Sequence, residues 1–290
     1  MVNVGWWVTI GVPAGLAAAG LVLGAVAATR PYRPRVRPRP RPGGSPLDVV
    51  IPVGPHDADA LPRLVACVRA NVVDLGRVYV VSFDPALRVD GCTVIPEAAF
   101  PFSKADVVAH GPIPAARAGW YLQQLIKLHA GRAIPDLSPH YLVVDADTFF
   151  LKPTTFVEGG RGLFNTGTEY HPPYFAHMLR LHPDFRRVAP HSGVVHHMVF
   201  ARDLLEAMMA RVQDHHGGRP FWQVFLGVVD PAAAAHSGAS EYELYYNYVR
   251  QFAPDRLRVR RLLWRNQSRW PSALDGCLFA YVSVHWYKRR

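Results

Sequence analysis

The segment Tyr141–Phe150, with the sequence Y-L-V-V-D-A-D-T-F-F, constrains the fold of this chain more than any other segment. Its first four residues are apolar or aromatic and favour a β-strand, and Asp145 and Asp147 follow directly. A short apolar run of this kind is typical of a strand that is buried on both faces of an α/β sheet. Open α/β sheets bind ligands at the carboxyl ends of their strands, so the pattern predicts two carboxylates at a binding edge.

The spacing of these two carboxylates indicates a cation. Asp145 and Asp147 have no basic residue within several positions to offset their negative charges. Oxygen ligands suit Mg²⁺ or Mn²⁺, which one or two carboxylates commonly hold together with substrate phosphates. The alternative is structural, because a strand end followed by an Asx turn also favours aspartate. We therefore predict a site for Mn²⁺ or Mg²⁺ here, provided that the rest of the chain supports it.

The N-terminal residues 1–29 have the composition of a membrane anchor. Residues 5–28 carry no charge, and at about 1.5 Å of rise per residue they could cross a bilayer core of roughly 30 Å. Trp6 and Trp7 stand where an interfacial anchor would. A cleaved signal peptide is the alternative, but the segment begins without Lys or Arg and its apolar run is unusually long for one. We predict an uncleaved, single-pass transmembrane helix.

Residues 30–46 form a basic linker in which six arginines alternate with prolines. This composition favours an extended spacer without a fold of its own. The six arginines account for most of the formal net charge of +10, so the high pI does not indicate a nucleic-acid partner. Arginines beside a membrane span are attracted by anionic headgroups, and the positive-inside rule places the following domain in the cytoplasm. A lumenal placement stays open, because other signals can set the topology of a single span.

Residues 47–290 are long enough for one large α/β domain. Strand and helix patterns alternate through its first hundred residues, which predicts a mostly parallel sheet flanked by helices. The three cysteines have no metal or redox spacing and are expected to be buried. The expected strands are 48–53, 77–82, 92–95, 141–144, 192–200, 257–263 and 278–285, and the expected helices are 59–73, 117–130, 201–215, 220–229 and 240–252.

Four blocks of this domain resemble a GT-A-type glycosyltransferase. They are a first strand D-V-V-I-P-V, the D-x-D strand end, the segment S-E-Y-E and a C-terminal strand that ends in His. The runs R-A-G-W-Y-L-Q-Q-L-I-K-L, D-A-D-T-F-F and S-E-Y-E-L-Y-Y are also similar to a group of glycosyltransferase-like proteins known mainly as a domain of unknown function. The resemblance covers about residues 48–287. It implies a Rossmann-like GT-A fold and a transferase that moves a sugar from a UDP- or GDP-sugar donor to a hydroxyl of a glycan, lipid or protein.

The resemblance also implies a set of metal-binding residues. Asp147 would ligate the cation directly, while Asp145 would contact the donor ribose or reach the metal through water. His285, at the end of the last predicted strand, would complete the metal shell, although a histidine there could equally be an ordinary surface or core residue. The cation would offset the charge of the departing diphosphate as a Lewis acid.

The segment Ser240–Glu243 carries both a structural and a catalytic prediction. The pattern S-x-x-E before an apolar helical run is a capping box, with Ser240 at the N-cap and Glu243 at N3. The resemblance places a general base here in inverting enzymes, and we assign it to Glu241 because the cap leaves that residue free. Glu243 could also reach the acceptor. A retaining enzyme would need no such base, and the sequence leaves the stereochemistry open.

Donor-binding residues are predicted in two further places. Arg117 and Lys127 lie on the helix before the D-x-D strand, where either could neutralise a donor phosphate. The alternative for both is a solvated helix face. Pro52 and Val53 end the first strand, where the resemblance places the nucleobase, and Asp57 or Asp59 in the following loop could meet the uracil or ribose.

The adjacent residues His196 and His197 do not predict a zinc site. Neighbouring side chains in a strand point to opposite faces, so the two imidazoles cannot easily share one ion. His196 or Ser192 could instead line the acceptor cleft.

Two alternative functions belong to other classes. A haloacid-dehalogenase-like phosphatase also uses a D-x-D after an apolar strand, but it places the motif at the start of its domain and prefers Thr or Val where this chain has Phe149. A non-catalytic, membrane-tethered module that binds nucleotides or sugars would show binding without turnover.

Overall fold

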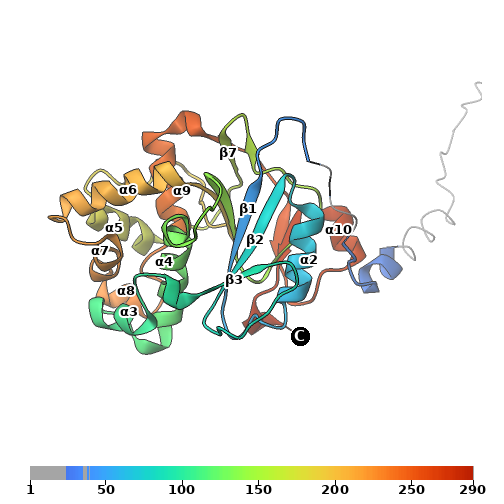
Figure 1. Cartoon of the computed structure of the whole chain (residues 1–290), viewed down its shortest axis with the longest axis horizontal. Helices are drawn as coiled ribbons and strands as arrows, with labels where there is room; N and C mark the ends of the chain where they lie inside the picture. Colours follow the sequence, from blue (N-terminus) through green and yellow to red (C-terminus); the bar gives the residue numbers. More distant parts are fainter. Residues whose placement is uncertain (1–23, 35–37, 39, 290) are drawn as a thin grey trace, which may run out of the picture.

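The structure is a computed structural model that describes residues 24–34, 38 and 40–289. Its centre is a five-stranded sheet with the strand order β3-β2-β1-β4-β8 (Figure 1). The first four strands in this order run parallel to one another, and β8 runs antiparallel to β4. This arrangement confirms the prediction of a mixed α/β fold with a parallel-rich sheet. The strands are β1 (Leu47–Val53), β2 (Leu75–Ser82), β3 (Thr93–Pro96), β4 (His140–Val144) and β8 (His197–Ala201).

The middle strands are buried because helices cover both faces of the sheet. Every residue of β1 is buried, including Asp48. The Asp48 carboxylate is satisfied by the backbone N–H groups of Arg77, at 2.7 Å, and Ser138, at 3.0 Å. A buried polar group costs little when hydrogen bonds replace its lost contacts with water. Asp48 therefore ties β1 to the segments on either side of it.

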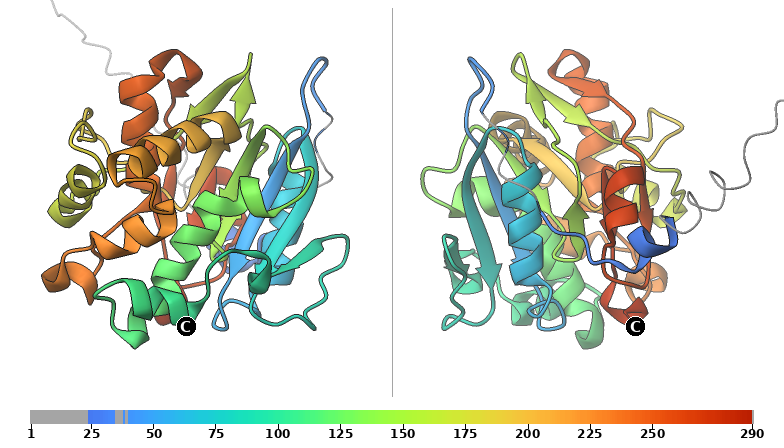
Figure 2. Two further views of the ribbon diagram at one scale, coloured as in Figure 1. Left: turned by 60° about the vertical axis from the view of Figure 1, so that its left-hand side comes forward. Right: turned by 90° about the vertical axis from the view of Figure 1, so that its right-hand side faces the viewer.

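Most helices gather on one side of the sheet, and α2 and α10 lie on the other (Figures 1 and 2). Within the larger group, α4 carries Lys127 and α9 begins at Glu241, and both residues belong to the predicted site. The helices are α2 (Leu61–Asn71), α3 (Lys104–His110), α4 (Ala118–Ala133), α5 (Pro172–Leu181), α6 (Arg202–His215), α7 (Phe221–Gly227), α8 (Pro231–Ala234), α9 (Glu241–Phe252) and α10 (Ala273–Leu278).

Two small sheets complete the domain, and one of them positions the site. β11 (Tyr281–Ser283) runs antiparallel to β5 (Thr148–Phe150) and parallel to β10 (Trp264–Asn266). Ser283 pairs with Thr148, so the residues after β11 return to the end of β4. The second sheet is formed by β6 (Val157–Glu158), β7 (Arg161–Phe164) and β9 (Leu257–Val259).

Three predicted strands are shorter than expected. The strand expected over 192–200 begins only at His197, because His196 has a left-handed backbone with φ of 65° that interrupts an extended chain. The strands expected over 257–263 and 278–285 contract to β9 and β11. The expectation of buried cysteines is correct for Cys67 and wrong for Cys277, which is exposed.

The predicted transmembrane helix lies mostly outside the described residues. Residues 24–29 are helical, and within the described part of the chain no helix has both the length and the apolar character to cross a bilayer. The division into anchor, linker and domain therefore stays a prediction.

The start of the linker is docked against the domain. The Tyr32 N–H donates to the Pro271 carbonyl at 2.8 Å, and the Tyr32 hydroxyl donates to the Leu151 carbonyl at 2.8 Å. The Tyr32 ring lies so close to α10 that a Cβ at Gly276 would approach it to 2.8 Å. The proline and arginine pattern did not reveal this docking, because its partners lie far away in the sequence.

Candidate functional site

A cleft of about 830 Å³ lies at the carboxyl ends of β1 and β4. Its position is the one predicted for the ligand site of an open α/β sheet. The predicted site residues that line it are Pro52, Arg117, Lys127, Asp145, Asp147, Glu241 and His285.

A tight turn directs both aspartates into this cleft. The last four residues of β4 are buried, and the Thr148 N–H then donates to the Asp145 carbonyl at 3.0 Å, which closes a turn before β5. The Asp145 N–H donates to the His196 carbonyl at 3.0 Å, so the turn is also fixed to the residue that precedes β8. This turn is closed by backbone groups, and it positions the carboxylates.

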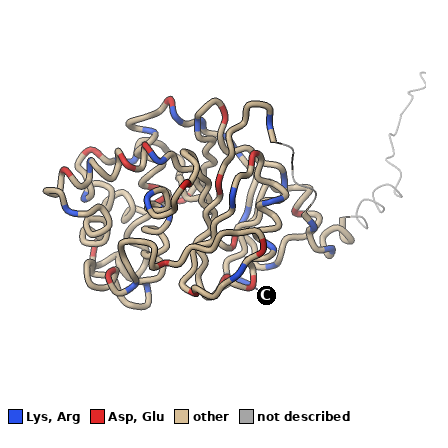
Figure 3. The backbone as a smooth tube through the Cα atoms, viewed as in Figure 1, with Lys and Arg blue, Asp and Glu red and all other residues tan. Residues whose placement is uncertain are grey.

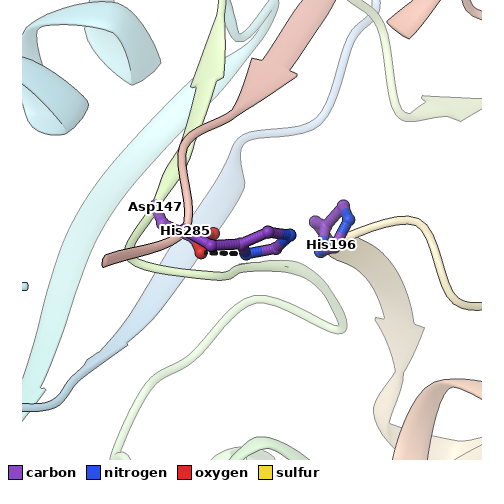
Figure 4. Close-up of side chains that lie close together, drawn as sticks. All are labelled: Asp147, His196 and His285. Atoms are coloured by element: carbon purple, nitrogen blue, oxygen red, sulfur yellow. Dashed lines mark hydrogen bonds and ion pairs between the residues drawn. The ribbon is translucent and has the colours of Figure 1, made fainter. Parts of the chain in front are cut away.

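Asp147, His196 and His285 form a group that could hold a metal ion (Figure 4). One ligand atom from each side chain lies within 4.8 Å of the others, and Oδ2 of Asp147 is 2.7 Å from Nδ1 of His285. Two ligands of one ion lie about 3–4 Å apart when each metal–ligand bond is about 2.1 Å. The three side chains are therefore within reach of a single cation, and the sequence had not pointed to His196 as one of them.

The formal charges around the group also suit a divalent cation. The acidic side chains that line the cleft outnumber the basic ones: six carboxylates, those of Asp57, Glu97, Asp145, Asp147, Glu169 and Glu241, face three basic groups, those of Lys104, Arg117 and Lys127. A divalent cation beside Asp147 would offset part of this excess of negative charge.

Asp145 has other partners. Its Oδ1 accepts hydrogen bonds from Nζ of Lys127 at 2.6 Å and from the Tyr242 hydroxyl at 2.7 Å. Its Oδ2 lies 3.5 Å from Nδ1 of His196. Burial alone would raise the pKa of Asp145, but the Lys127 ammonium and His196 hold it below its usual range. Asp145 is therefore a charged hydrogen-bond hub beside the Asp147 group, and its role as a metal ligand stays a prediction.

Lys127 is buried and not part of a solvated helix face, so that alternative is wrong for this residue. Its Nζ lies 2.6 Å from both Asp145 and Glu241, and 4.3 Å from the centre of the Tyr242 ring. Although burial alone would lower the pKa of Lys127, the two carboxylates raise it, so the ammonium stays charged.

The surroundings of Lys127 differ from those of charged groups elsewhere in the domain. Basic and acidic residues are interspersed over the described chain (Figure 3), and many meet as exposed pairs such as Arg256 with Asp203 at 2.9 Å. Exposed pairs contribute little to stability. The Lys127 ammonium instead joins α4, the end of β4 and the start of α9 with little exposure to solvent.

The two glutamates of α9 lie in different places. Glu241 is at the cleft, buried, with Oε1 bound to Lys127 at 2.6 Å, and burial raises its pKa against the lowering effect of Lys127. Glu243 is outside the cleft, where its Oε2 accepts from the Ser192 hydroxyl at 2.7 Å and from the Gly193 N–H at 2.9 Å.

The predicted capping box of α9 is therefore only half formed. Ser240 accepts from the Glu243 N–H at 3.2 Å, as expected of an N-cap. The Glu243 carboxylate does not return to the cap, because the Ser192–Gly193 loop and Asn247 hold it. This anchoring turns Glu243 away from the cleft and corrects the expectation that it could reach an acceptor.

The remaining predicted residues divide between the cleft and the core. Arg117 lines the cleft, with its guanidinium 4.5 Å from the centre of the Trp120 ring and Nη2 3.3 Å from the Ser237 hydroxyl. Pro52 also lines the cleft, whereas Val53 packs into the core, so its side chain cannot contact a nucleobase. Asp57 lies at the cleft as predicted, but its carboxylate is paired with Arg289.

Comparisons with known proteins give a family and similar solved structures. A family model described as "Family of unknown function (DUF6492)" matches residues 59–269. No curated protein matches the chain. Among solved structures, the apo form of mouse xyloside xylosyltransferase 1 is similar, with a TM-score of 0.43 and 14% sequence identity over 85% of this chain and 100% of that chain.

Proposed function

The chain belongs to the DUF6492 family of unknown function, and from its site we propose that it is a metal-dependent GT-A-type glycosyltransferase. It would move a sugar from a nucleotide-sugar donor to a hydroxyl acceptor. One observation carries the proposal: Asp147 and His285, predicted as metal ligands, lie 2.7 Å apart in a cleft at the carboxyl edge of the sheet. The resemblance of four sequence blocks to GT-A enzymes supports the same activity.

The residues of the cleft have separate tasks in this proposal. Asp147 and His285 hold the cation, which as a Lewis acid stabilises the charge of the departing diphosphate. Arg117, at the cleft and beside Trp120, supplies a guanidinium for a donor phosphate. Lys127 is fully engaged by two carboxylates, so it acts by positioning Asp145 and Glu241 and does not itself bind the donor.

Glu241 remains the proposed general base for an inverting reaction. Its Oε1 is bound to Lys127, so the proton of the acceptor hydroxyl would pass to the other oxygen. Its raised pKa makes it a better proton acceptor than an exposed glutamate. A retaining reaction would leave Glu241 with the positioning role alone.

The proposed membrane tether is separate from the chemistry. We propose that residues 1–29 anchor the chain and that the contacts of Arg30 and Tyr32 with the loop before α10 hold the domain close to that anchor. The acceptor would then be a lipid, glycan or protein at the membrane surface.

Hydrolysis of the donor tests the activity. The chain is incubated with a panel of UDP- and GDP-sugars, with and without Mn²⁺, and release of the nucleotide is measured. Asp147→Asn is expected to lower metal-dependent hydrolysis by more than about 100-fold, because even groups outside the first ligand shell contribute 10–100-fold. Asp255→Asn, which changes an exposed aspartate far from the cleft, is the matched control. Equal hydrolysis by the two variants, or no turnover of any donor, would remove the proposal.

The same assay separates the alternatives. A phosphatase would release phosphate from a phosphate monoester and lose this activity in Asp145→Asn, since the first aspartate of its motif is the nucleophile. A binding module would protect against thermal unfolding in the presence of a nucleotide sugar but would release no nucleotide.

A further inference from the structure

We infer that His196 is a third protein ligand of the cation, so that the site consists of one carboxylate and two imidazoles and prefers Mn²⁺ to Mg²⁺. The inference rests on the proposed metal-dependent function and goes further by naming the ligand set and the class of cation. It also assigns Asp145 to the surroundings of the site and not to the metal.

The backbone at His196 is the first observation. A φ of 65° is uncommon for a residue other than glycine, although asparagine, aspartate and histidine adopt it more often than the rest, and strained backbones of this kind cluster at functional sites. The residues on either side, Val195 and His197, are buried, whereas His196 turns its ring toward the cleft. The break in the strand is therefore what allows adjacent histidines to differ: His197 enters the core and His196 joins the site.

The second observation is that the three ligands come from backbones that are already fixed to one another. The Val284 N–H donates to the Asp147 carbonyl at 2.8 Å, which holds His285 beside Asp147. The Asp145 N–H donates to the His196 carbonyl at 3.0 Å, which holds His196 at the same turn. The His196 and His285 rings lie 5.0 Å apart between centroids, and Figure 4 shows the Asp147 carboxylate against the His285 ring. Binding of an ion would open the 2.7 Å contact between Asp147 and His285 to the roughly 3–4 Å of two ligands and draw the His196 ring toward them.

Asp145 is kept from the cation by its own hydrogen bonds. Its Oδ1 already accepts from Lys127 and Tyr242, and turning it toward Asp147 would leave the buried Lys127 with one partner fewer. Its Oδ2 lies 3.5 Å from Nδ1 of His196. Carboxylates in this position commonly orient a metal-binding imidazole from outside the ligand shell.

The ligand types set the preference for the cation. Mg²⁺ is bound almost entirely by oxygen and keeps most of its water, whereas imidazole nitrogen favours first-row transition metals. Two imidazoles among three protein ligands therefore discriminate against Mg²⁺. Among transition metals we use Mn²⁺ as the probe, because its free form gives a direct electron paramagnetic resonance signal.

Binding of Mn²⁺ to the 290-residue chain without any nucleotide sugar tests the inference. His196→Gly is the main variant, because glycine adopts a positive φ without strain and the substitution removes only the side chain. We expect it to weaken Mn²⁺ binding by roughly tenfold or more, since lost outer-shell partners alone weaken metal binding by 10–100-fold. His191→Gly, at an exposed histidine five positions earlier, is the matched control and is expected to bind Mn²⁺ like the unchanged chain.

A second variant tests the preference itself. His196→Asp replaces a nitrogen ligand by oxygen at a backbone conformation that aspartate tolerates. We expect the ratio of Mn²⁺ affinity to Mg²⁺ affinity, measured by competition, to fall in this variant. Circular dichroism and thermal unfolding of each variant verify that it is folded.

The outcomes separate this inference from the proposed function. Mn²⁺ binding that depends on His196, in a chain that hydrolyses no nucleotide sugar, would uphold the ligand set and reject the transferase. Donor hydrolysis that depends on Asp147, together with unchanged Mn²⁺ binding in folded His196→Gly, would overturn the inference and leave the transferase. A larger loss of Mn²⁺ binding in Asp145→Asn than in Asp147→Asn would also overturn it, because Asp145 would then be the ligand.

Discussion

The two walls of the cleft are held together by charge in different ways. On one wall, Lys127 of α4 binds Asp145 and Glu241, and the three side chains are only 10%, 24% and 5% exposed. On the other wall, Arg289 near the C-terminus is 14% exposed and pairs with two residues of the loop after β1, Asp57, which is 16% exposed, and Asp59, which is 66% exposed. We call the first the buried wall and the second the clasp.

Because the two walls differ in exposure, substitutions in them are expected to have different effects on stability and on ligand binding. Removing one partner of a buried ion pair leaves a charge that neither water nor protein can solvate, which is strongly destabilising. A pair that water reaches loses little when it is broken. The buried wall should therefore fail as part of the fold, whereas the clasp should affect ligand binding with little change in stability.

The largest expected effect is that of Lys127→Met. The substitution leaves Asp145 and Glu241 without their common ammonium, and we expect the free energy of unfolding to fall by about 3–5 kcal/mol. Chemical denaturation measures the loss. Lys104→Met, at an exposed lysine that also lines the cleft, is the control and should change it by less than about 0.5 kcal/mol.

A compensated variant sharpens the test. Lys127→Met combined with Asp145→Asn and Glu241→Gln removes the unpaired charges, and it should recover part of the loss, because a buried ionic group can often be replaced by neutral residues. A loss below about 1 kcal/mol in the single variant would mean that water reaches this wall after all.

The next largest expected effect is a dependence of the free energy of unfolding on pH, to which buried histidines contribute. Burial lowers the pKa of His129 on α4 to about 4, and that of His177 on α5 likewise to about 4. The unfolded chain, with a histidine pKa of about 6.5, binds more protons than the folded one between these values. The contribution of these two histidines to the free energy of unfolding is therefore fully present above about pH 6.5 and is lost as the pH falls toward 4.

Each of these histidines should contribute about 2 kcal/mol to the loss between pH 7 and pH 5, at about 1.4 kcal/mol per pH unit. His129→Phe removes one of the two titrations, and its ring suits a site between Phe102 and Phe221. Denaturation at several pH values should show a shallower slope for this variant. His191→Asn, at an exposed histidine, should keep the original slope, and an unchanged slope in His129→Phe would assign the acid sensitivity to other groups.

The sequence predicted most of the fold because the central elements have strong local patterns. The bounds of β1, α2, β4, α4 and α9 lie within a few residues of the expected ones, since apolar periodicity and the Ser240 cap are local signals. β5, β6 and β10 are two or three residues long, too short to carry a periodic pattern. Their strand character comes from distant partners.

The site was predictable where a motif carried it and not where distant contacts did. Asp147 was predicted from the D-x-D motif, and His285 from its place at the end of the last expected strand. The burial of Lys127 between two carboxylates was not predicted, because the second of them, that of Glu241, lies 114 positions away in the sequence. His196 was predicted to line the cleft but not to lie beside Asp147 and His285, because strand alternation was assumed at a residue whose backbone is left-handed.

The smallest change in the free energy of unfolding is expected from a substitution in the clasp. Its size tests whether the two walls contribute differently to stability. Arg289 donates from Nη1 to the His56 carbonyl at 2.9 Å and to Asp59 at 2.9 Å, and from Nε to the Val284 carbonyl at 3.1 Å. Arg289→Gln should lower the free energy of unfolding by less than Lys127→Met does, because Asp59 is exposed and Asp57 lines the open cleft, where water can solvate a carboxylate left unpaired.

The same substitution should weaken Mn²⁺ binding several-fold, because the segment that carries His285 loses its tie to the loop after β1. Lys288→Gln, at the adjacent exposed residue, is the control and should change neither quantity. If Arg289→Gln destabilises the chain as much as Lys127→Met, the clasp belongs to the core and the contrast fails. If it changes stability slightly and Mn²⁺ affinity clearly, then one wall fixes the fold while the other sets how firmly the cation is held.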